Sequence, residues 1–161
     1  MRHVIKTVYD EYDFPWEPDG YHADLWKIEE TYITPGGGFW VAEHDGEVVG
    51  AVGLEVFPII PGPYGEVVDH DGIKRIGGAD SELMRLYVLG KARGLKLGRR
   101  LSETVVEEAR KRGRKTLEIW SDKVLTQAHA LYQSQGATIV GERLCSDPTE
   151  APEWGMYIDL K

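Results

Sequence analysis

The first part of the chain carries apolar residues at the spacing of amphipathic helices. Residues 5–12 are expected to form one short helix, and residues 21–32 a second, on which Leu25, Ile28 and Tyr32 share a face. Prolines between the two segments and a Pro-Gly-Gly-Gly run after the second would end them. The pattern therefore predicts a helical region at the start of the chain.

The helical spacing then gives way to two short runs of mostly apolar residues. Residues 39–43 and 47–54 flank the His-Asp-Gly sequence at 44–46, which predicts a β-hairpin. Residues 58–80 are rich in Pro and Gly, and this irregular insertion contains a second candidate hairpin around a turn at 69–72. The middle of the chain is therefore expected to supply antiparallel strands.

A strand at 83–88 begins the second half, and the clearest helix of the chain follows it and ends before Gly113. Four apolar residues recur at four-residue spacing on this helix: Leu97, Leu101, Val105 and Ala109.

A strand at 116–120 is expected next. A further helix would be capped by Ser121 or Asp122 and ended by Gly136. The last two strands are expected at 137–140 and 155–160. Strand, helix, strand, helix and strand after a hairpin describe a mixed sheet flanked by helices.

Composition narrows the class of protein. The chain has 161 residues, of which 42% are hydrophobic and 29% charged, so we expect one folded domain with an apolar core. Its single cysteine, Cys145, excludes an internal disulfide and suits a buried side chain in a cytoplasmic protein. No apolar run could span a membrane, and a formal charge of −8 argues against general nucleic-acid binding. The five histidines show no metal-ligand spacing, so no metal is expected.

A basic segment at residues 91–100 contrasts with this acidic background. It carries five of the nineteen Lys and Arg residues and no acid, and it runs into the start of the predicted helix. Cations oppose the positive end of a helix dipole, whereas free N–H groups of a glycine-containing loop at a helix start bind phosphate. The segment therefore indicates a site for a phosphorylated ligand, and the alternative is a solvated basic turn.

Two linked motifs resemble those of the GNAT superfamily of acyl-CoA-dependent N-acyltransferases. The first is the strand at 82–88 with Arg93-Gly-Leu-Lys-Leu-Gly98 and the helix after it, and the second is Ala128-His-Ala-Leu-Tyr132 with the Gln-Gly pair that follows. With the predicted hairpin, the resemblance covers residues 39–145 of a single domain, 1–161. It implies an α/β (α+β) fold with a mixed, mostly antiparallel sheet and a V-shaped cofactor cleft between two central strands.

The resemblance also implies acetyl-CoA as the cosubstrate. Backbone N–H groups from Gly94 to Gly98 would hold its pyrophosphate, and basic side chains would add charge. The pantetheine arm would pair with the strand edge, where a main-chain N–H near Leu86 or Tyr87 would polarise the thioester carbonyl. The residues expected to bind the cofactor are Leu86, Tyr87, Val88, Arg93, Gly94, Leu95, Lys96, Leu97, Gly98 and Arg99.

Acyl transfer to an amine requires a proton acceptor and benefits from a proton donor. By resemblance, Tyr132 is the general acid for the thiolate of CoA; the alternative is a core tyrosine. Glu82 is the first candidate for the general base, directly or through water, whereas Glu43 and Glu55 are weaker ones. Each of these carboxylates is alternatively a solvated strand residue. His129 is expected to be a solvated or structural histidine.

Three features depart from the family pattern. Lys96 replaces the middle glycine of the pyrophosphate loop, which the backbone would tolerate if it stays helical there. Leu125 replaces the Asn that often opens the second motif, so any role of that Asn in binding is absent. The family's first strand is missing, and the resulting sheet edge would need covering by the N-terminal segment or by a second copy in a homodimer.

The acceptor is expected to be a small-molecule or peptide amine. The helical region 1–38 would border the acceptor end of the cleft, and nine of the sixteen aromatic residues lie in the first forty positions. The first thirty residues also carry eight acids against three basic residues. Rings and carboxylates suit a cationic amine, with Glu17 and Asp19 as charged contacts. Alternatively, the rings fill the core and the acids cover a solvated face.

Two other functions stay open at this point. A non-catalytic acyl-CoA-binding regulatory module would keep the fold without turnover, and a small nucleic-acid-binding domain would place residues 91–100 in a groove. Nucleic acid would require neither Tyr132 nor a strand edge that pairs with pantetheine. The sequence therefore favours an N-acetyltransferase that acts on a primary amine.

Overall fold

The computed structural model describes all 161 residues. Its helices are α1 (Arg2–Glu11), α2 (Leu97–Lys111) and α3 (Thr126–Ser134), with short turns of 3-10 or π helix at Ala23–Trp26, Glu29–Ile33 and Gly90–Ala92. Six strands form the main sheet: β1 (Gly38–His44), β2 (Glu47–Val56), β5 (Ser81–Val88), β6 (Thr116–Asp122), β7 (Thr138–Leu144) and β8 (Pro152–Asp159). Their spatial order is β1-β2-β5-β6-β8-β7, and β3 (Val67–His70) and β4 (Ile73–Ile76) form a separate hairpin.

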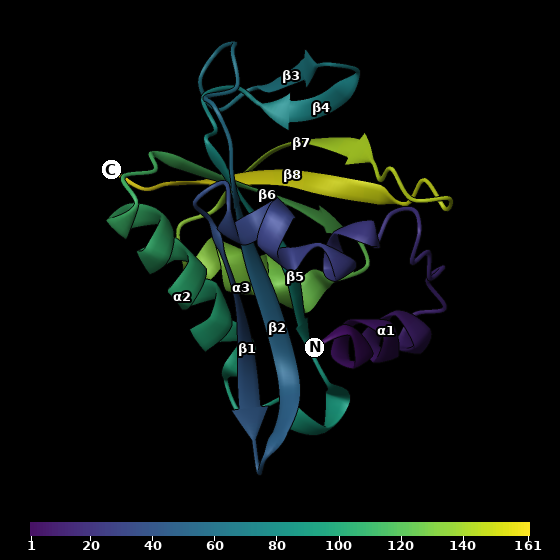
Figure 1. The fold of residues 1–161 in the computed structure, drawn as a ribbon. Helices are drawn as coiled ribbons and strands as arrows, with labels where there is room; N and C mark the ends of the chain where they lie inside the picture. Colours follow the sequence, from purple (N-terminus) through teal and green to yellow (C-terminus); the bar gives the residue numbers. More distant parts are fainter.

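The main sheet divides into two halves at β5 and β6. These strands pair in parallel only at Ser81 with Leu117 and Glu82 with Glu118, whereas every other pairing in the sheet is antiparallel. In Figure 1, β1, β2 and β5 run down the molecule while β6, β7 and β8 run across it. The predicted mixed, mostly antiparallel sheet that opens between two central strands is confirmed.

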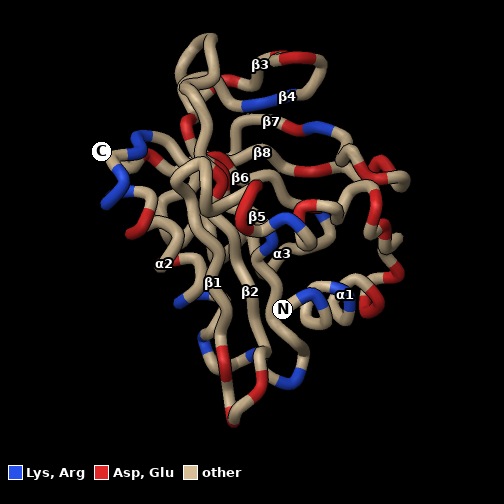
Figure 2. The backbone as a smooth tube through the Cα atoms, viewed as in Figure 1, with Lys and Arg blue, Asp and Glu red and all other residues tan.

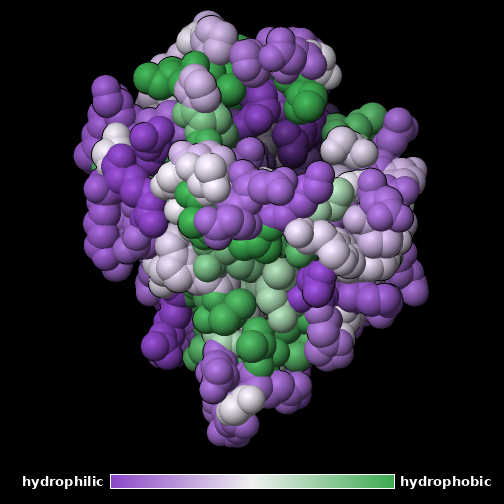
Figure 3. Space-filling model, in the orientation of Figure 1, coloured by the Kyte–Doolittle hydropathy of each residue, from purple (hydrophilic) through white to green (hydrophobic).

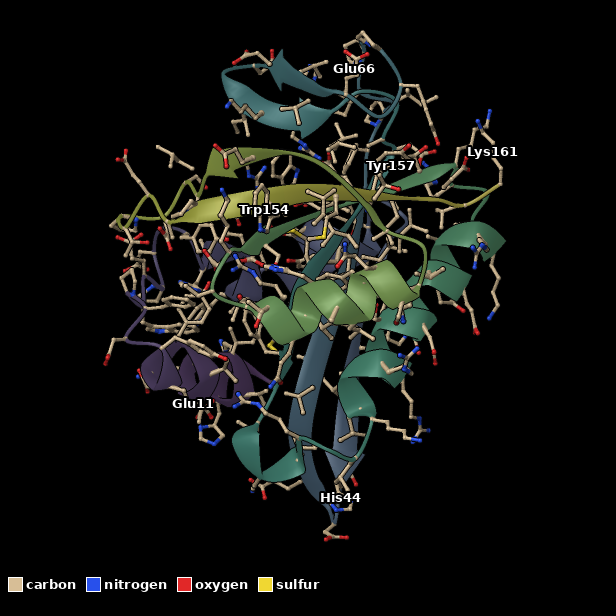
Figure 4. All side chains as sticks on the ribbon, turned by 180° about the vertical axis from the view of Figure 1, so that it is seen from behind. Glu11, His44, Glu66, Trp154, Tyr157 and Lys161 are labelled. Atoms are coloured by element: carbon tan, nitrogen blue, oxygen red, sulfur yellow. The ribbon has the colours of Figure 1, made fainter.

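Helices cover both faces of the sheet. The turns within residues 23–33 lie in front of it, and α2 and α3 lie behind it (Figures 1 and 4). Leu101 and Val105 of α2 are buried against β2 in the main core, which confirms the predicted apolar face. Gly50 allows this contact, because a Cβ there would stand 2.9 Å from Cδ1 of Leu101. The helix therefore packs directly on the strands that carry the site.

The predicted turns have the expected conformations. Asp45 and Gly46 join β1 to β2 with φ angles of 52° and 78°, the left-handed pair of a tight hairpin turn. Gly113 has φ of 72° after α2, and the N–H of Arg114 donates to the carbonyl of Ala109 at 3.0 Å, as in a Schellman cap. The hairpin expected inside the insertion is also confirmed, and it lies beyond β7 at the top of Figure 1.

The predicted helix at 21–32 is wrong. The structure breaks it at Lys27, where φ is −128° and ψ is 36°, and leaves a 3-10 turn and a π turn. Tyr32 is fully buried, and its hydroxyl donates to Asp24 at 2.5 Å. Asp24 in turn pairs with Arg85 of β5. These tertiary contacts outweigh the helical spacing, because an isolated helix of this length has little stability of its own.

The predicted cap of α3 is also wrong. Ser121 and Asp122 extend β6, and the helix begins after Leu125 without a hydrogen bond from a capping side chain. The helix ends as expected, because Gly136 follows it with φ of 95°. No helix of the structure has the length and apolar composition needed to cross a membrane.

Candidate active site

Two cavities meet where β5 and β6 diverge. We call the first, bounded by residues 86–98 and 124–131, the loop cavity, with a volume of about 340 Å³. The second, bounded by residues 72–75, 82–87 and 143–153, is the hairpin cavity, of about 590 Å³. A recess lined by hydrophilic residues opens beneath the β3–β4 hairpin in Figure 3. The two cavities share four lining residues: Leu86, Tyr87, Leu125 and Ala128.

A β-bulge shapes the shared wall on β5. Arg85 and Leu86 stand opposite the single residue Val52 of β2, so the ladder is interrupted there. Arg85 has φ of 56°, and its Nη2 lies 2.8 Å from Oδ1 of Asp24 and donates to the carbonyl of Tyr21 at 2.6 Å. These contacts hold an unfavourable backbone conformation in place. The backbone of Leu86 is thereby freed from β2 at the point where the cavities join.

The loop between β5 and α2 forms one end of the loop cavity. Gly94 has φ of 87°, and no side chain caps α2, so the first N–H groups of the helix are available to an anion. Leu95 is exposed and Arg99 contacts Glu103 and Ser134, so these two predicted residues do not line the cavity. The other eight predicted residues do: Leu86, Tyr87, Val88, Arg93, Gly94, Lys96, Leu97 and Gly98.

Three of the five cations in segment 91–100 are ion-paired, which the sequence did not predict. Lys91 pairs with Glu47, and Figure 2 shows the acidic β1–β2 turn beside the basic turn after β5. Arg93 lies 2.5 Å from Glu11, which Figure 4 places on α1 next to that turn. Arg99 makes the third pair, within α2. These side chains tie the loop to its neighbours before any ligand arrives.

Lys96 is the cation left unpaired at the loop cavity. Its φ is 59°, so the condition of a right-handed helical backbone is not met, and the residue lies in the left-handed region that glycine favours. It immediately precedes α2 and lines the cavity. An anion at the start of α2 would therefore meet both free N–H groups and this ammonium.

Tyr132 reaches the hairpin cavity from α3. It is 4% exposed and packs in the main core, so it is a core residue that also lines the cavity. Burial raises the pKa of its phenol, with a further contribution from Tyr87, so the hydroxyl keeps its proton at neutral pH. A phenol in this state can donate a hydrogen bond into the cavity. Its role as the general acid stays a prediction.

Glu82 stands where β5 and β6 separate, directly beside Glu118. The two residues are 6% and 0% exposed. Arg75 of β4 reaches both, with Nη2 3.3 Å from Oε2 of Glu82 and Nε donating to Oε1 of Glu118 at 2.5 Å. The pKa of Glu82 is raised to about 8, first by burial and then by the charge of Glu118, while Arg75 opposes the rise. A carboxyl that titrates near neutral pH can exchange a proton with an amine.

The other candidate residues have no comparable position. Glu43 is exposed and Glu55 half-buried, and neither lines a cavity. His129 is buried with Nε2 3.2 Å from Oγ of Ser121, as expected of a structural histidine. Cys145 is buried, and burial raises its pKa to about 11, which keeps it a thiol. No group of three or more His, Cys, Asp or Glu side chains is placed to hold a metal ion.

Tyr21 is the only member of the N-terminal aromatic and acidic set that lines the hairpin cavity. Tyr9 and His22 instead pack edge to face, with ring centroids 4.5 Å apart. Glu17 and Asp19 line neither cavity, so the structure does not bring them to the site. Most of this set therefore follows the alternative interpretation, in which the rings fill the core and the acids cover the surface.

The charged residues of the hairpin cavity come from other elements: Lys74, Arg75, Glu82, Arg85, Asp122, Arg143, Glu150 and Glu153. Arg143 pairs with Glu153, its Nε donating to Oε2 at 2.6 Å. Asp122 has no such partner, and its Oδ1 is buried without a hydrogen bond. Burial raises the pKa of Asp122 to about 6, with neighbouring acids as further causes. Two carboxylates, Asp122 and Glu150, thus lie in the cavity without an ion pair.

Of the charged residues that line this cavity, the sequence indicated only Glu82 as a site residue; the others were missed, as was Glu118 beside Glu82. The sequence does contain a signal for Glu118, which stands between two apolar residues in a strand that is otherwise buried. A buried carboxylate needs a cation or hydrogen-bond donors, so this position indicates that a partner exists but does not identify it. The sequence contains no signal for Arg75, because its contact depends on how the insertion folds back onto β6.

The chain matches the profile of the Acetyltransferase (GNAT) family over residues 5–137. It is 30% identical over 138 residues to the uncharacterized N-acetyltransferase YjgM of Escherichia coli (strain K12), which covers 83% of this chain and 71% of that protein. It is 32% identical over 122 residues to N-acetyltransferase 8 of Rattus norvegicus, covering 75% of this chain and 49% of the relative. The chain thus spans about half the length of that second relative.

Solved structures share its fold. An acetyltransferase of the GNAT family from Staphylococcus aureus Mu50 has a TM-score of 0.74 at 20% identity, covering 99% of this chain and 91% of the other. The putative acetyltransferase yncA from Salmonella typhimurium, solved with its cofactor acetyl-CoA, has a TM-score of 0.61 at 19% identity, covering 91% and 75%. The family match spans the loop, the bulge and Tyr132 alike. The chain is therefore an acyltransferase that belongs to the acetyltransferase (GNAT) family.

Proposed function

We propose that this chain transfers an acetyl group from acetyl-CoA to a primary amine that attacks the thioester directly. The observation that supports this most is the meeting of the two cavities at the bulge of β5. The loop cavity would take CoA, with its pyrophosphate on the N–H groups from Gly94 to Gly98. The hairpin cavity would take the amine, beside Glu82 and Tyr132.

Each residue has a distinct task in this reaction. The carboxylate of Glu82 accepts the proton that the amine loses as its nitrogen bonds to the thioester carbon. A main-chain N–H near Leu86 or Tyr87 stabilises the negative charge that develops on the carbonyl oxygen. Tyr132 donates a hydrogen bond to the sulfur as the C–S bond breaks and the thiolate leaves.

Binding of the cosubstrate is the first expected result. CoA or acetyl-CoA should raise the melting temperature, since a ligand of the folded state stabilises it by mass action, and ATP and NAD should do so much less. Lys96→Glu should weaken CoA binding by about tenfold at low salt and by less at high salt. Lys96→Gly removes the charge but suits the left-handed backbone, so it should lose less affinity than Lys96→Glu. Isothermal titration at two salt concentrations measures both.

Arg100→Glu is the matched control for this experiment. Arg100 belongs to the same basic segment, but it lines neither cavity. Its affinity for CoA should stay within about twofold of the unchanged protein, as for surface changes away from a site. Equal losses of CoA affinity in Arg100→Glu and Lys96→Glu, or equal stabilisation by CoA, ATP and NAD, would show that the loop binds anions in general and is not specific for CoA.

The proposed acceptor carries a second positive charge, which Asp122 binds. Asp122 has a buried oxygen without a hydrogen bond, and its neighbours include further carboxylates. A cation there would satisfy that oxygen and offset the repulsion between the acids. Lys74 is the one cation lining this cavity that makes no ion pair, and it is exposed. The unpaired charge of the cavity is therefore negative.

A panel of acceptors measures this preference. Aliphatic diamines should have a higher kcat/KM than alkyl amines and ω-amino acids of equal length. Asp122→Asn should reduce that preference by about tenfold, because the contact it removes is between a charged pair in a partly buried site. Asp71→Asn, which removes a charge at the exposed tip of the β3–β4 hairpin, should leave it unchanged. If ω-amino acids or alkyl amines are the best acceptors, the acceptor is not a diamine-like cation.

A further inference from the structure

The β3–β4 hairpin brings a cation to two buried carboxyl groups of the central strands. The guanidinium of Arg75 on β4 stacks 4.4 Å from the ring centroid of Phe57 and reaches Glu82 and Glu118 beyond it. The side chain of Arg75 is 19% exposed, and Glu118 is fully buried. The next residue, Ile76, donates its backbone N–H to Oε2 of Glu118 at 2.8 Å. The insertion therefore supplies both the cation and a backbone donor for a carboxylate in the central strand.

The charges around Glu82 do not balance without a proton. Glu82 and Glu118 are neighbours in register, and Arg75 is the cation that both contact. Glu118 accepts two short hydrogen bonds, from Arg75 and from the backbone of Ile76, whereas Glu82 has only the 3.3 Å contact with Arg75. Arg143 on β7 also lowers the pKa of Glu82, and Glu55 on β2 raises it. Glu82 is therefore a carboxyl group whose pKa is raised by its buried position and by Glu118, with Arg75 opposing the rise.

We propose that Arg75 is a positioning residue for acetyl transfer: the insertion hairpin uses it to place a positive charge against both Glu118 and Glu82, so that Glu82 can accept the proton of the amine. This inference rests on the proposed role of Glu82 as the general base. The proton that leaves the amine nitrogen bonds to an oxygen of Glu82, and water takes it from there once the product has left. Without Arg75, two unneutralised carboxylates would hold that proton more tightly.

Strand β4 and the turn before it also line the hairpin cavity, which is the proposed acceptor site. Residues 72–75 line the hairpin cavity, and Nη1 of Arg143 donates to the carbonyl of Lys74 at 3.2 Å. Nζ of Lys74 donates in return to the carbonyl of Glu142 on β7 at 3.3 Å. The cation beside Glu82 is therefore in place only when the hairpin is docked over the acceptor site.

Opposite substitutions should shift the pH profile in opposite directions. Arg75→Gln removes the cation, so the acid limb of kcat/KM should move to higher pH by about one unit, with activity recovering at alkaline pH. Glu118→Gln removes the like charge, so the same limb should move to lower pH by about one unit. Arg75→Lys keeps the charge and should stay closer to the unchanged protein than Arg75→Gln does. KM for acetyl-CoA should not change, because Arg75 does not line the loop cavity.

Two further variants separate this role from a purely structural one. A structural ion pair would lower kcat at every pH without moving the limb. The double variant Arg75→Gln with Glu118→Gln removes one charge of each sign, so it should fold and return the limb toward its original position. Asp71→Asn changes the charge of the hairpin at its exposed tip and should leave the profile unchanged.

A second readout follows the proton itself. Carbon-13 NMR of the glutamate carboxyl groups, with the Glu82 signal assigned by its loss in Glu82→Gln, gives the titration of Glu82 without turnover. Opposite shifts of this titration and of the pH profile in Arg75→Gln and Glu118→Gln are the expected result. If neither moves, the inference is overturned and the acetyl transfer stands. If the titration moves but the profile does not, Glu82 is not the base, and the inference is overturned together with that assignment.

Discussion

Glu82→Gln should lower kcat/KM for the amine by about 10²-fold near pH 8, the lower end of the range for general acid–base catalysis. The pKa of Glu82 is raised to about 8, so its carboxylate form, which is the base, gains population as the pH rises toward that value. The unchanged protein should therefore show a rise in activity that levels off near pH 8. In Glu82→Gln the rise should instead follow the free amine, whose pKa is near 10. The difference in kcat/KM between Glu82→Gln and the unchanged protein should therefore become smaller at high pH, as a pH–rate profile would measure.

Loss of folding is not an adequate explanation for such a result. Glu82 binds its proton more tightly in the folded protein than at its ordinary pKa of 4.5, so its stabilising contribution is present at low pH and is lost as the pH rises through about 8. Gln resembles the protonated form, so Glu82→Gln should be at least as stable at pH 8, as thermal unfolding would measure. Glu43→Gln is the matched control, because Glu43 is an exposed strand carboxylate that lines neither cavity. A loss below threefold in Glu82→Gln would remove it as the base.

Tyr132→Phe should lower kcat by about 10²-fold while the affinity for acetyl-CoA stays the same. The raised pKa of the phenol lies above that of a thiol, so Tyr132 acts by a hydrogen bond to the developing thiolate. That bond matters less when the leaving thiol is more acidic. An aryl thioester of lower leaving-group pKa should therefore show a smaller deficit in Tyr132→Phe than acetyl-CoA does. Stopped-flow measurement of thiol release compares the two donors.

Tyr157→Phe serves as the control for the loss of a phenolic hydroxyl. Tyr157 lies on β8 (Figure 4), packs edge to face on Tyr64 and lines neither cavity. Its kcat should stay within about twofold of the unchanged protein. If Tyr132→Phe also keeps its kcat within about twofold of the unchanged protein with both thioesters, Tyr132 is a core residue only, and water protonates the thiolate.

Local sequence patterns predict the parts of this fold that depend on local rules. The turn at Asp45-Gly46, the apolar face of α2 and the glycine after it follow from backbone conformations and helical spacing. The order of strand β5, helix α2 and strand β6 also follows from the spacing of apolar residues along the chain. The segment 21–32 did not follow its spacing, because Tyr32, Asp24 and the bulge of β5 join residues that are far apart in sequence.

In the candidate site, too, features that depend on local patterns could be predicted, whereas contacts between distant segments could not. Tyr132, Glu82 and eight of the ten residues named for cofactor binding line the two cavities. The charge balance of the site could not be predicted, because Arg93 is neutralised by a helix at the start of the chain and Glu118 by the inserted hairpin. The charge of Lys96 was visible, but its left-handed backbone was not. Ion pairs between distant segments have no sequence period, so only the structure reveals them.

Acetyl transfer is tested most directly by the amine-dependent release of CoA from acetyl-CoA, measured by thiol detection together with mass spectrometry of the acceptor. One free thiol and one N-acetylated amine are expected for each acetyl-CoA consumed, with no release above background when the amine is omitted. Glu82→Gln and Tyr132→Phe should each reduce this release while CoA still binds. Tight binding of acetyl-CoA without amine-dependent release across diamines, alkyl amines, amino acids and peptides would contradict acetyl transfer and indicate a non-catalytic acyl-CoA-binding protein.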